Sequence, residues 1–200
     1  MRKGIFIFIA VLIVAANIDW IGSCETERTD VELFEHNINH AKMYECKSED
    51  YGFAIGVPSF FSEVPDSLKE DRSRLRFRFN TKWETVVIEG YTIYNEGKSL
   101  KEGMDSLAKT LHSTHQKLGN DNFILSGPQY ENGNYIEGYS YYSKFVQNYK
   151  LWYVYTMVYP DRYKPALKRM FKEIDEWQVW ERPGLKLKQG ESQTPRHKRK

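Results

Sequence analysis

The feature that most constrains the fold is a run of large apolar residues at positions 149–159 that alternates along an extended chain. Successive side chains of a strand point to opposite faces of a sheet. One face of this run therefore carries Leu151, Tyr153, Tyr155 and Tyr159, and the other carries Trp152, Val154 and Val158. An edge strand of a half-solvated sheet does not need two apolar faces. We therefore expect this strand to lie within a sheet that is covered on both sides.

Other segments show the alternation of a strand and are separated by short turns. They are residues 43–46, 52–58, 74–79, 85–94, 123–131 and 134–145. Asn132-Gly133 is a favoured type I′ hairpin pair, and we expect a second turn at residues 146–148. Strands that are joined by turns this short must be antiparallel.

Two segments have the period of an amphipathic helix. Ser99 and Glu102 form a capping box, and the apolar residues that follow to Leu111 predict a helix of about four to five turns. Lys164-Pro165 suits a first helical turn, and the apolar residues from Ala166 to Trp177 predict a second helix. The expected fold class is α+β, an antiparallel sheet of about six or seven strands between helices, hence an α/β/α sandwich.

The composition excludes several classes of protein. Aromatic residues make up 15% of the 200 residues, which is incompatible with disorder throughout. Two cysteines are too few for a disulfide scaffold or a zinc site built from thiolates. The net charge of +2 is too small to favour a strongly polyanionic partner for the domain as a whole. We expect no binding to nucleic acid.

The first 23 residues have the pattern of a signal peptide. Arg2 and Lys3 precede an apolar run at residues 5–16, which is shorter than the roughly 20 residues that span a bilayer. Residues 21–24, Ile-Gly-Ser-Cys, resemble a bacterial lipobox, which implies cleavage before Cys24 and acylation (palmitate) of its thiol. There are two alternatives. The protein is secreted and Cys24 pairs with Cys46, or the apolar segment stays uncleaved as a membrane anchor. If Cys24 carries lipid, Cys46 is expected to be a lone, unreactive thiol, opposed by nearby carboxylates.

The remaining chain divides into three parts. Residues 24–42 are rich in charge, and we expect a tether with at most a short helical turn. Residues 43–181 form the α+β domain. Residues 182–200 hold seven Lys or Arg against one acid and are expected to be a basic, disordered tail. Such a tail suits anionic lipid or surface glycans, or simply a solvated terminus.

Short patterns in the domain resemble the PsbP-like superfamily, which includes proteins of the PsbP, Mog and DcrB types. The patterns are YGFAIGVP at 51–58, RLRFRF at 74–79, TVVIEGYTIY at 85–94, SLKEGMDSL at 99–107, and the segment from 152 to 177. The resemblance implies an antiparallel sheet between helices that serves binding and assembly. For its exported, lipidated members it implies an envelope protein of poorly known role. It implies no functional residues.

An arginine row is the candidate binding site. Arg72, Arg74, Arg76 and Arg78 alternate with apolar residues, so their guanidinium groups share one strand face. Arg74, Arg76 and Arg78 are the candidate anion-binding residues, suited to phosphate or carboxylate. The alternative is a solvated face that pairs with glutamates of the next strand, such as Glu89.

No catalytic or metal site is predicted. His112 and His115, on the predicted helix, and His36 and His40 are spaced to share a helix face, but surface histidines explain them better. The carboxylates Glu84, Glu89, Glu137 and Asp175 are scattered, and we expect no cofactor. The tyrosines of residues 135–159 are expected to form core and a recognition patch.

The sequence therefore predicts an exported, lipid-anchored, non-catalytic binding or scaffolding protein of the bacterial cell envelope. Its partners would be a membrane, through lipidated Cys24, and an envelope protein. The membrane would face the periplasm or the exterior, and free secretion is the alternative. A secreted small-ligand carrier or hydrolase with a cleft between sheet and helix is the alternative function. A deep pocket with convergent polar groups would favour that second reading.

Overall fold

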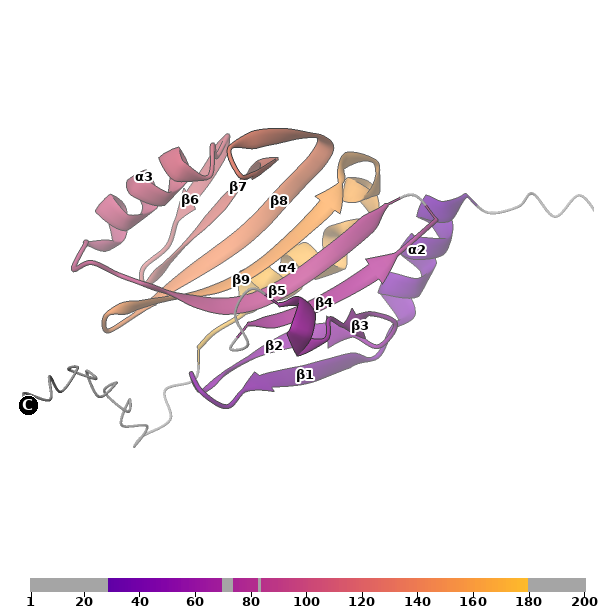
Figure 1. Ribbon diagram of the computed structural model, residues 1–200, viewed down its shortest axis with the longest axis horizontal. Helices are drawn as coiled ribbons and strands as arrows, with labels where there is room; N and C mark the ends of the chain where they lie inside the picture. The colour runs from indigo at the N-terminus through magenta and orange to yellow at the C-terminus, as the bar shows by residue number, and fades with distance from the viewer. Residues whose placement is uncertain (1–28, 70–73, 83, 180–200) are drawn as a thin grey trace, which may run out of the picture.

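The computed structural model describes residues 29–69, 74–82 and 84–179. Its main sheet has seven antiparallel strands in the order β3-β4-β5-β9-β8-β7-β6 (Figure 1). They are β3 (Ser62–Glu63), β4 (Leu75–Asn80), β5 (Thr85–Tyr94), β6 (His115–Leu118), β7 (Asn122–Glu131), β8 (Asn134–Asn148) and β9 (Leu151–Pro160). A separate antiparallel hairpin pairs β1 (Met43–Ser48) with β2 (Phe53–Pro58).

Helices cover both faces of the main sheet. One face packs against the β1–β2 hairpin, α2 (Asp30–His40), the 3₁₀ helix η2 (Asp161–Leu167) and α4 (Lys168–Glu176). The other face packs against α3 (Leu100–Thr110). A short 3₁₀ helix, η1 (Asp66–Leu68), follows β3. The predicted fold class, an antiparallel sheet between helices, is confirmed.

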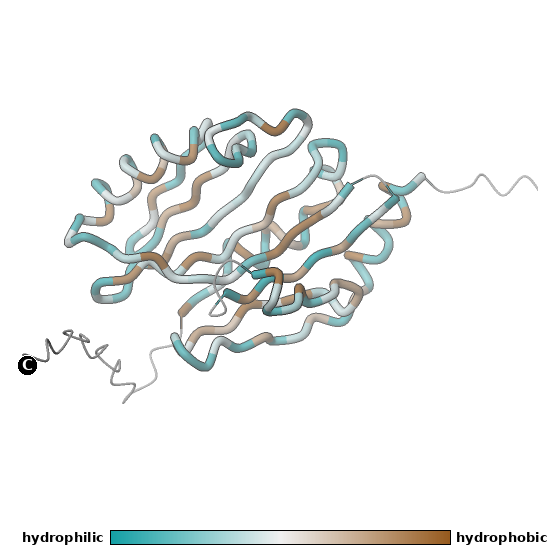
Figure 2. Tube along the Cα trace, viewed as in Figure 1, coloured by the Kyte–Doolittle hydropathy of each residue, from teal (hydrophilic) through white to brown (hydrophobic). Residues whose placement is uncertain are grey.

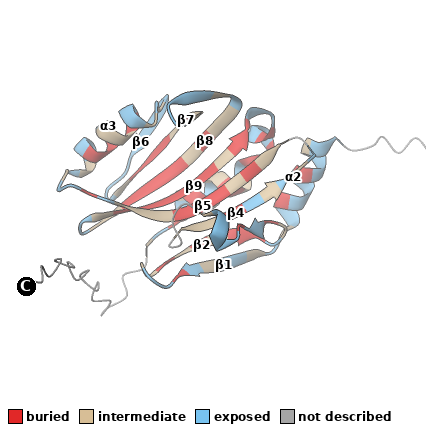
Figure 3. Cartoon of the chain, in the orientation of Figure 1, coloured by how far each residue is buried: buried red, intermediate tan, exposed pale blue. Residues whose placement is uncertain are grey.

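The central strand β9 is buried on both faces, as its two apolar faces predicted (Figure 3). Tyr155 and Tyr159 belong to the larger core beneath α4, and Trp152 and Val154 belong to the smaller core beneath α3. Brown and near-white segments alternate along the central strands, and the turns are mostly teal (Figure 2). The sheet is therefore the middle layer of three.

The prediction of a tether for residues 24–42 is wrong from residue 30 onward. Thr29 and Glu32 form a capping box, and α2 runs for 11 residues. Phe34 and Ile38 are completely buried, and Arg169 donates hydrogen bonds to three carbonyls at the end of α2, those of Ile38, Asn39 and Ala41. Because only two of its side chains are buried, this helix has a weak apolar pattern, which is why the tether prediction failed.

Smaller differences concern the ends of elements. β8 runs to Asn148, so the turn falls at Tyr149 and Lys150 rather than at 146–148, and Tyr149 has a φ of 51°. α3 has 11 residues, about three turns rather than four to five. The last helix begins as η2, and the short strands β3 and β6 were not predicted.

None of the helices in the described ranges has the length and apolar character to cross a membrane. The predicted signal peptide, Cys24 and the basic tail lie outside the described residues.

Candidate functional site

Four polar residues lie in one line across the α3 face of the sheet. Arg76 of β4 is opposite Glu89 of β5, and Glu89 is opposite Thr156 of β9. Thr156 is in turn opposite Ser143 of β8. Directly opposed residues on neighbouring strands place their side chains on the same face. We call Arg76, Glu89, Thr156 and Ser143 the polar row.

Three of the four residues of the polar row are buried, although they lie on a face that is otherwise largely apolar, and the Arg76 side chain is 33% exposed. Glu89, Thr156 and Ser143 are 9%, 6% and 4% exposed. Arg76 Nε lies 2.9 Å from one carboxylate oxygen of Glu89, and the hydroxyls of Ser143 and Thr156 are 2.5 Å apart. Burying such groups costs free energy even when they are bonded, and apolar residues would pack here at no such cost. The row is therefore a candidate for function rather than for stability.

A cleft lies above the row because α3 covers only part of this face. The apolar neighbours of the row, Phe145 and Val154, lie in the core beneath α3, but the helix ends at Thr110. Beyond it a cleft of about 240 Å³ exposes Glu89, Thr156 and Ser143 at its floor. In Figure 1, α3 lies at the upper left and leaves the right-hand ends of β8 and β9 uncovered.

The tip of the β7–β8 hairpin contributes to the cleft. The pairing of β7 with β8 shifts register between Pro128 and Tyr130, and Gly138 has a φ of 74°, which favours glycine. The tip turns at Asn132 and Gly133, both with positive φ, as predicted from the pair. Tyr130 stacks on His112 with ring centroids 4.2 Å apart, so the hairpin meets the end of α3.

Two tyrosines complete the floor of the cleft. The Arg74 guanidinium lies 4.2 Å from the centroid of the Tyr91 ring, and burial raises the pKa of Tyr91 to about 12. Burial also raises the pKa of Tyr141, whose hydroxyl is shielded from solvent. Both phenols therefore stay protonated at neutral pH.

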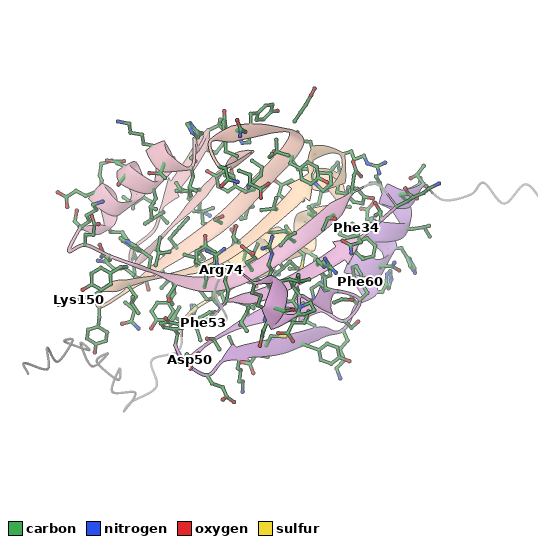
Figure 4. All side chains as sticks on the ribbon, in the orientation of Figure 1. Phe34, Asp50, Phe53, Phe60, Arg74 and Lys150 are labelled. Atoms are coloured by element: carbon green, nitrogen blue, oxygen red, sulfur yellow. The ribbon has the colours of Figure 1, made fainter. Side chains whose placement is uncertain are left out.

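Two residues of the predicted arginine row lie at the rim of this cleft, next to Glu89 of its lining. Arg74 and Arg76 both form ion pairs with Glu89, at 3.7 and 2.9 Å, as the alternative interpretation expected (Figure 4, where Arg74 is labelled). Arg78 is exposed and lies opposite Val87. Arg72 lies outside the described residues. Anion binding by Arg74, Arg76 and Arg78 stays a prediction.

The predicted histidine pairs are placed differently. His112 follows the end of α3 with a φ of 51°, and His115 begins β6, so the two do not share a helix face. His36 and His40 share a face of α2 and their rings are 4.4 Å apart. Among residues 29–69, 74–82 and 84–179, no group of three or more His, Cys, Asp or Glu side chains could hold a metal ion.

Glu84, Asp175 and Cys46 make contacts within the fold. Glu84 pairs with Arg162 at 2.5 Å, and Asp175 accepts a hydrogen bond from Tyr142. Cys46 on β1 is partly buried against the larger core, and burial, with Glu63 adding to it, raises the pKa of its thiol. The thiol is thus held in its unreactive, protonated form.

Sequence reasoning pointed to the rim of the cleft but missed its floor. Thr156 interrupts the apolar face of β9 between Val154 and Val158, and Ser143 interrupts that of β8 between Tyr141 and Phe145. These interruptions were visible in the sequence. That the two hydroxyls lie in one line with Glu89 follows only from the register between the strands, which the sequence does not show.

A comparison with solved structures identifies this architecture. The Ran-binding protein Mog1p of Saccharomyces cerevisiae superposes with a TM-score of 0.50 at 12% identity, over 70% of this chain and 96% of its own. The chain has the fold of Mog1p. Cyanobacterial PsbP (CyanoP) of Synechocystis sp. PCC 6803 is also similar, with a TM-score of 0.48, 11% identity, and 79% and 98% of the two chains covered.

Comparisons of the sequence add no closer relative. No protein-family model matches the chain, and no curated protein matches it. The expected fold is thus confirmed by the likeness to Mog1p, at an identity that says nothing of the residues of a site.

Proposed function

We propose that this chain is a non-catalytic binding or scaffolding protein. Mog1p, which shares its fold, is described as Ran-binding, so the PsbP-like fold supports a protein whose task is to bind another protein. The observation that carries the proposal is the cleft on the α3 face. Its lining includes the buried polar side chains of Glu89, Thr156 and Ser143.

The chemistry of the cleft supports binding rather than catalysis. The phenols of Tyr91 and Tyr141 have raised pKa values and do not supply a base at neutral pH. The Ser143 hydroxyl faces Thr156, at 2.5 Å, which cannot activate it as a nucleophile. The Glu89 carboxylate is occupied by ion pairs with arginine.

We further propose that the protein is exported and anchored by lipid on Cys24 to a membrane of the bacterial envelope. The support is the sequence pattern of residues 1–24. Thr29 caps α2 only five residues after Cys24, and five extended residues span at most about 18 Å. The anchor would hold the α2 end of the domain close to the membrane surface.

That end of the domain also carries the start of β5. Asp30 of α2 lies 3.9 Å from Arg162, which also binds Glu84 at the start of β5. The turn at Tyr149 and Lys150 lies at the other end of the sheet, where Lys150 accepts a hydrogen bond from Asn95 (Figure 4). The anchored domain would therefore present this turn farthest from the membrane.

A second function, the binding of a small ligand, is favoured by the shape of the cleft. Ligand sites are concave and combine apolar walls with a few convergent polar groups. The cleft combines Val158 and aromatic rings with the buried polar groups of Glu89, Thr156 and Ser143. A protein partner and a small ligand would use the same face.

Site-specific photocrosslinking in intact cells tests the binding function. A photoreactive amino acid at Tyr135, which is 54% exposed near the hairpin tip, is expected to give a discrete adduct with an envelope component. The same substitution at Tyr149, 85% exposed at the opposite end of β8, is the matched control. Adducts at neither position, with the protein folded and abundant, would contradict a binding function.

A further inference from the structure

We infer that the cleft on the α3 face binds a small, uncharged, polyhydroxylated molecule, that is, a carbohydrate. This rests on the small-ligand function proposed above and adds the chemical class of the ligand. It uses the polar row, the charge balance of the lining and the aromatic wall, each of which is described in turn.

The hydrogen-bonding groups of the lining match hydroxyl groups. Hydroxyls, such as those of Ser143 and Thr156, and the amide of Gln129 can each donate and accept, and the Glu89 carboxylate accepts several hydrogen bonds at once. A sugar hydroxyl likewise donates one hydrogen bond and accepts others. Adjacent sugar hydroxyls therefore find donors and acceptors in the paired hydroxyls of Ser143 and Thr156, 2.5 Å apart, and in Glu89 on the next strand.

The charge balance of the lining favours an uncharged ligand. Among the described residues that line the cleft, Glu89 is the one Asp, Glu, Lys or Arg side chain. Its charge is offset by Arg76 and Arg74, which sit at the rim and not in the lining. A cation would compete with these arginines for Glu89, and an anion inside the cleft would lie against the carboxylate. A neutral ligand meets neither cost.

The aromatic groups suit the apolar face of a sugar ring. Tyr130 is held by stacking on His112, with centroids 4.2 Å apart, and Tyr91 is held beneath Arg74. Rings whose positions are fixed before binding lose little entropy when a ligand packs on them. The volume of about 240 Å³ is below the roughly 300–1,000 Å³ of sites for drug-sized ligands, so a single ring fits within it.

Ligand-detected saturation-transfer NMR on the full chain, purified from membranes in detergent, tests the inference. The probes are a panel of hexoses and N-acetylhexosamines, with cyclohexanol as an apolar ring of similar size. Inorganic phosphate is the anion probe, and its binding is followed by broadening of its ³¹P resonance because it carries no carbon-bound proton. We expect saturable transfer to at least one sugar, none to cyclohexanol in the cleft, and no broadening of the phosphate resonance.

Matched variants locate the binding. Thr156→Val removes one hydroxyl at constant shape and should weaken sugar binding about threefold to tenfold, and Glu89→Gln about tenfold or more. Thr92→Val, which removes a hydroxyl on the neighbouring strand β5 outside the lining of the cleft, should leave affinity unchanged. Circular dichroism and the unfolding midpoint establish that each variant is folded.

Three outcomes would overturn the inference. Sugar binding that Thr156→Val and Glu89→Gln leave intact would place the sugar elsewhere. Binding of phosphate or cyclohexanol but of no sugar, lost in the same variants, would refute the carbohydrate and leave the small-ligand function standing. Binding of no probe would refute both.

Discussion

Gly103 of α3 lies directly against the indole ring of Trp152 on β9, and a methyl group at this glycine would overlap the ring. This close approach sets the position of α3 over the smaller core. It therefore also positions the end of the helix at Thr110, beside which the cleft begins.

Gly103→Val should destabilise the protein by about 1–3 kcal/mol, because an overpacked helix must move away from Trp152. Chemical denaturation measures the change in the free energy of unfolding. Lys101→Val places the same side chain at an exposed position of α3 and should change that free energy by no more than about 0.5 kcal/mol. Equal effects of both variants would show that the contact with Trp152 does not position the helix.

Arg76→Gln should lower the free energy of unfolding by about 1–3 kcal/mol, because Glu89 loses its donor at 2.9 Å while it stays buried. Arg78→Gln is the control from the same face of β4, since Arg78 is exposed. Its expected effect is within about 0.5 kcal/mol. If Arg76 proved as replaceable as Arg78, the ion pair would not hold the Glu89 carboxylate in place.

Lys144 of β8 is a buried lysine whose side chain caps the carboxyl end of α4. Its ammonium group donates to the carbonyls of Asp175 and Trp177, at 2.6 and 2.7 Å, and burial lowers its pKa. Lys144→Met should destabilise the protein by about 1–3 kcal/mol, because the carbonyls at the end of α4 lose their donor. Lys172→Met, at an exposed position of α4, should have little effect on the same urea unfolding curve. Loss of less than about 0.5 kcal/mol on Lys144→Met would mean that water replaces the ammonium group.

Buried tyrosines should make the protein sensitive to alkali. Burial, with Asp161 adding to it, raises the pKa of Tyr159 to about 12, and burial raises the pKa of Tyr155 well above its usual value. An unfolded tyrosine ionises near pH 10, so above about pH 10 the folded state binds more protons than the unfolded state. The stabilising contribution is therefore complete below about pH 10 and is lost as the pH rises toward about 12 and beyond.

Urea denaturation at a series of alkaline pH values, with tyrosinate absorbance recorded in parallel, measures this loss. Tyr159 alone should account for about 2–3 kcal/mol across that interval. Ionisation of all tyrosines near pH 10 in a protein that remains folded would contradict their burial.

The strands and the order of layers could be predicted from the sequence because their signals are local. The alternation in 149–159 requires a covered sheet whatever its partners are, and Asn132-Gly133 fixes a tight turn by its own backbone preferences. The same local reasoning found α3 through its capping box at Ser99.

The helix α2 and the floor of the cleft depend on contacts between distant residues. Phe34 is buried because it meets Tyr163, with ring centroids 5.0 Å apart, and nothing near Phe34 in the sequence indicates that partner. Glu89 was named as a partner for the arginines because β4 and β5 are consecutive. Thr156 and Ser143 join Glu89 only through the pairing of β9 with both β5 and β8.

The central claim is that this binding domain is held at a membrane by the thiol of Cys24. Its most direct test is metabolic labelling with radioactive palmitate, together with membrane fractionation, of the native chain and of the Cys24→Ala and Cys46→Ala variants. The native chain and Cys46→Ala should carry label and sediment with membranes, and Cys24→Ala should lose both properties. Unchanged labelling and sedimentation of Cys24→Ala would contradict the claim.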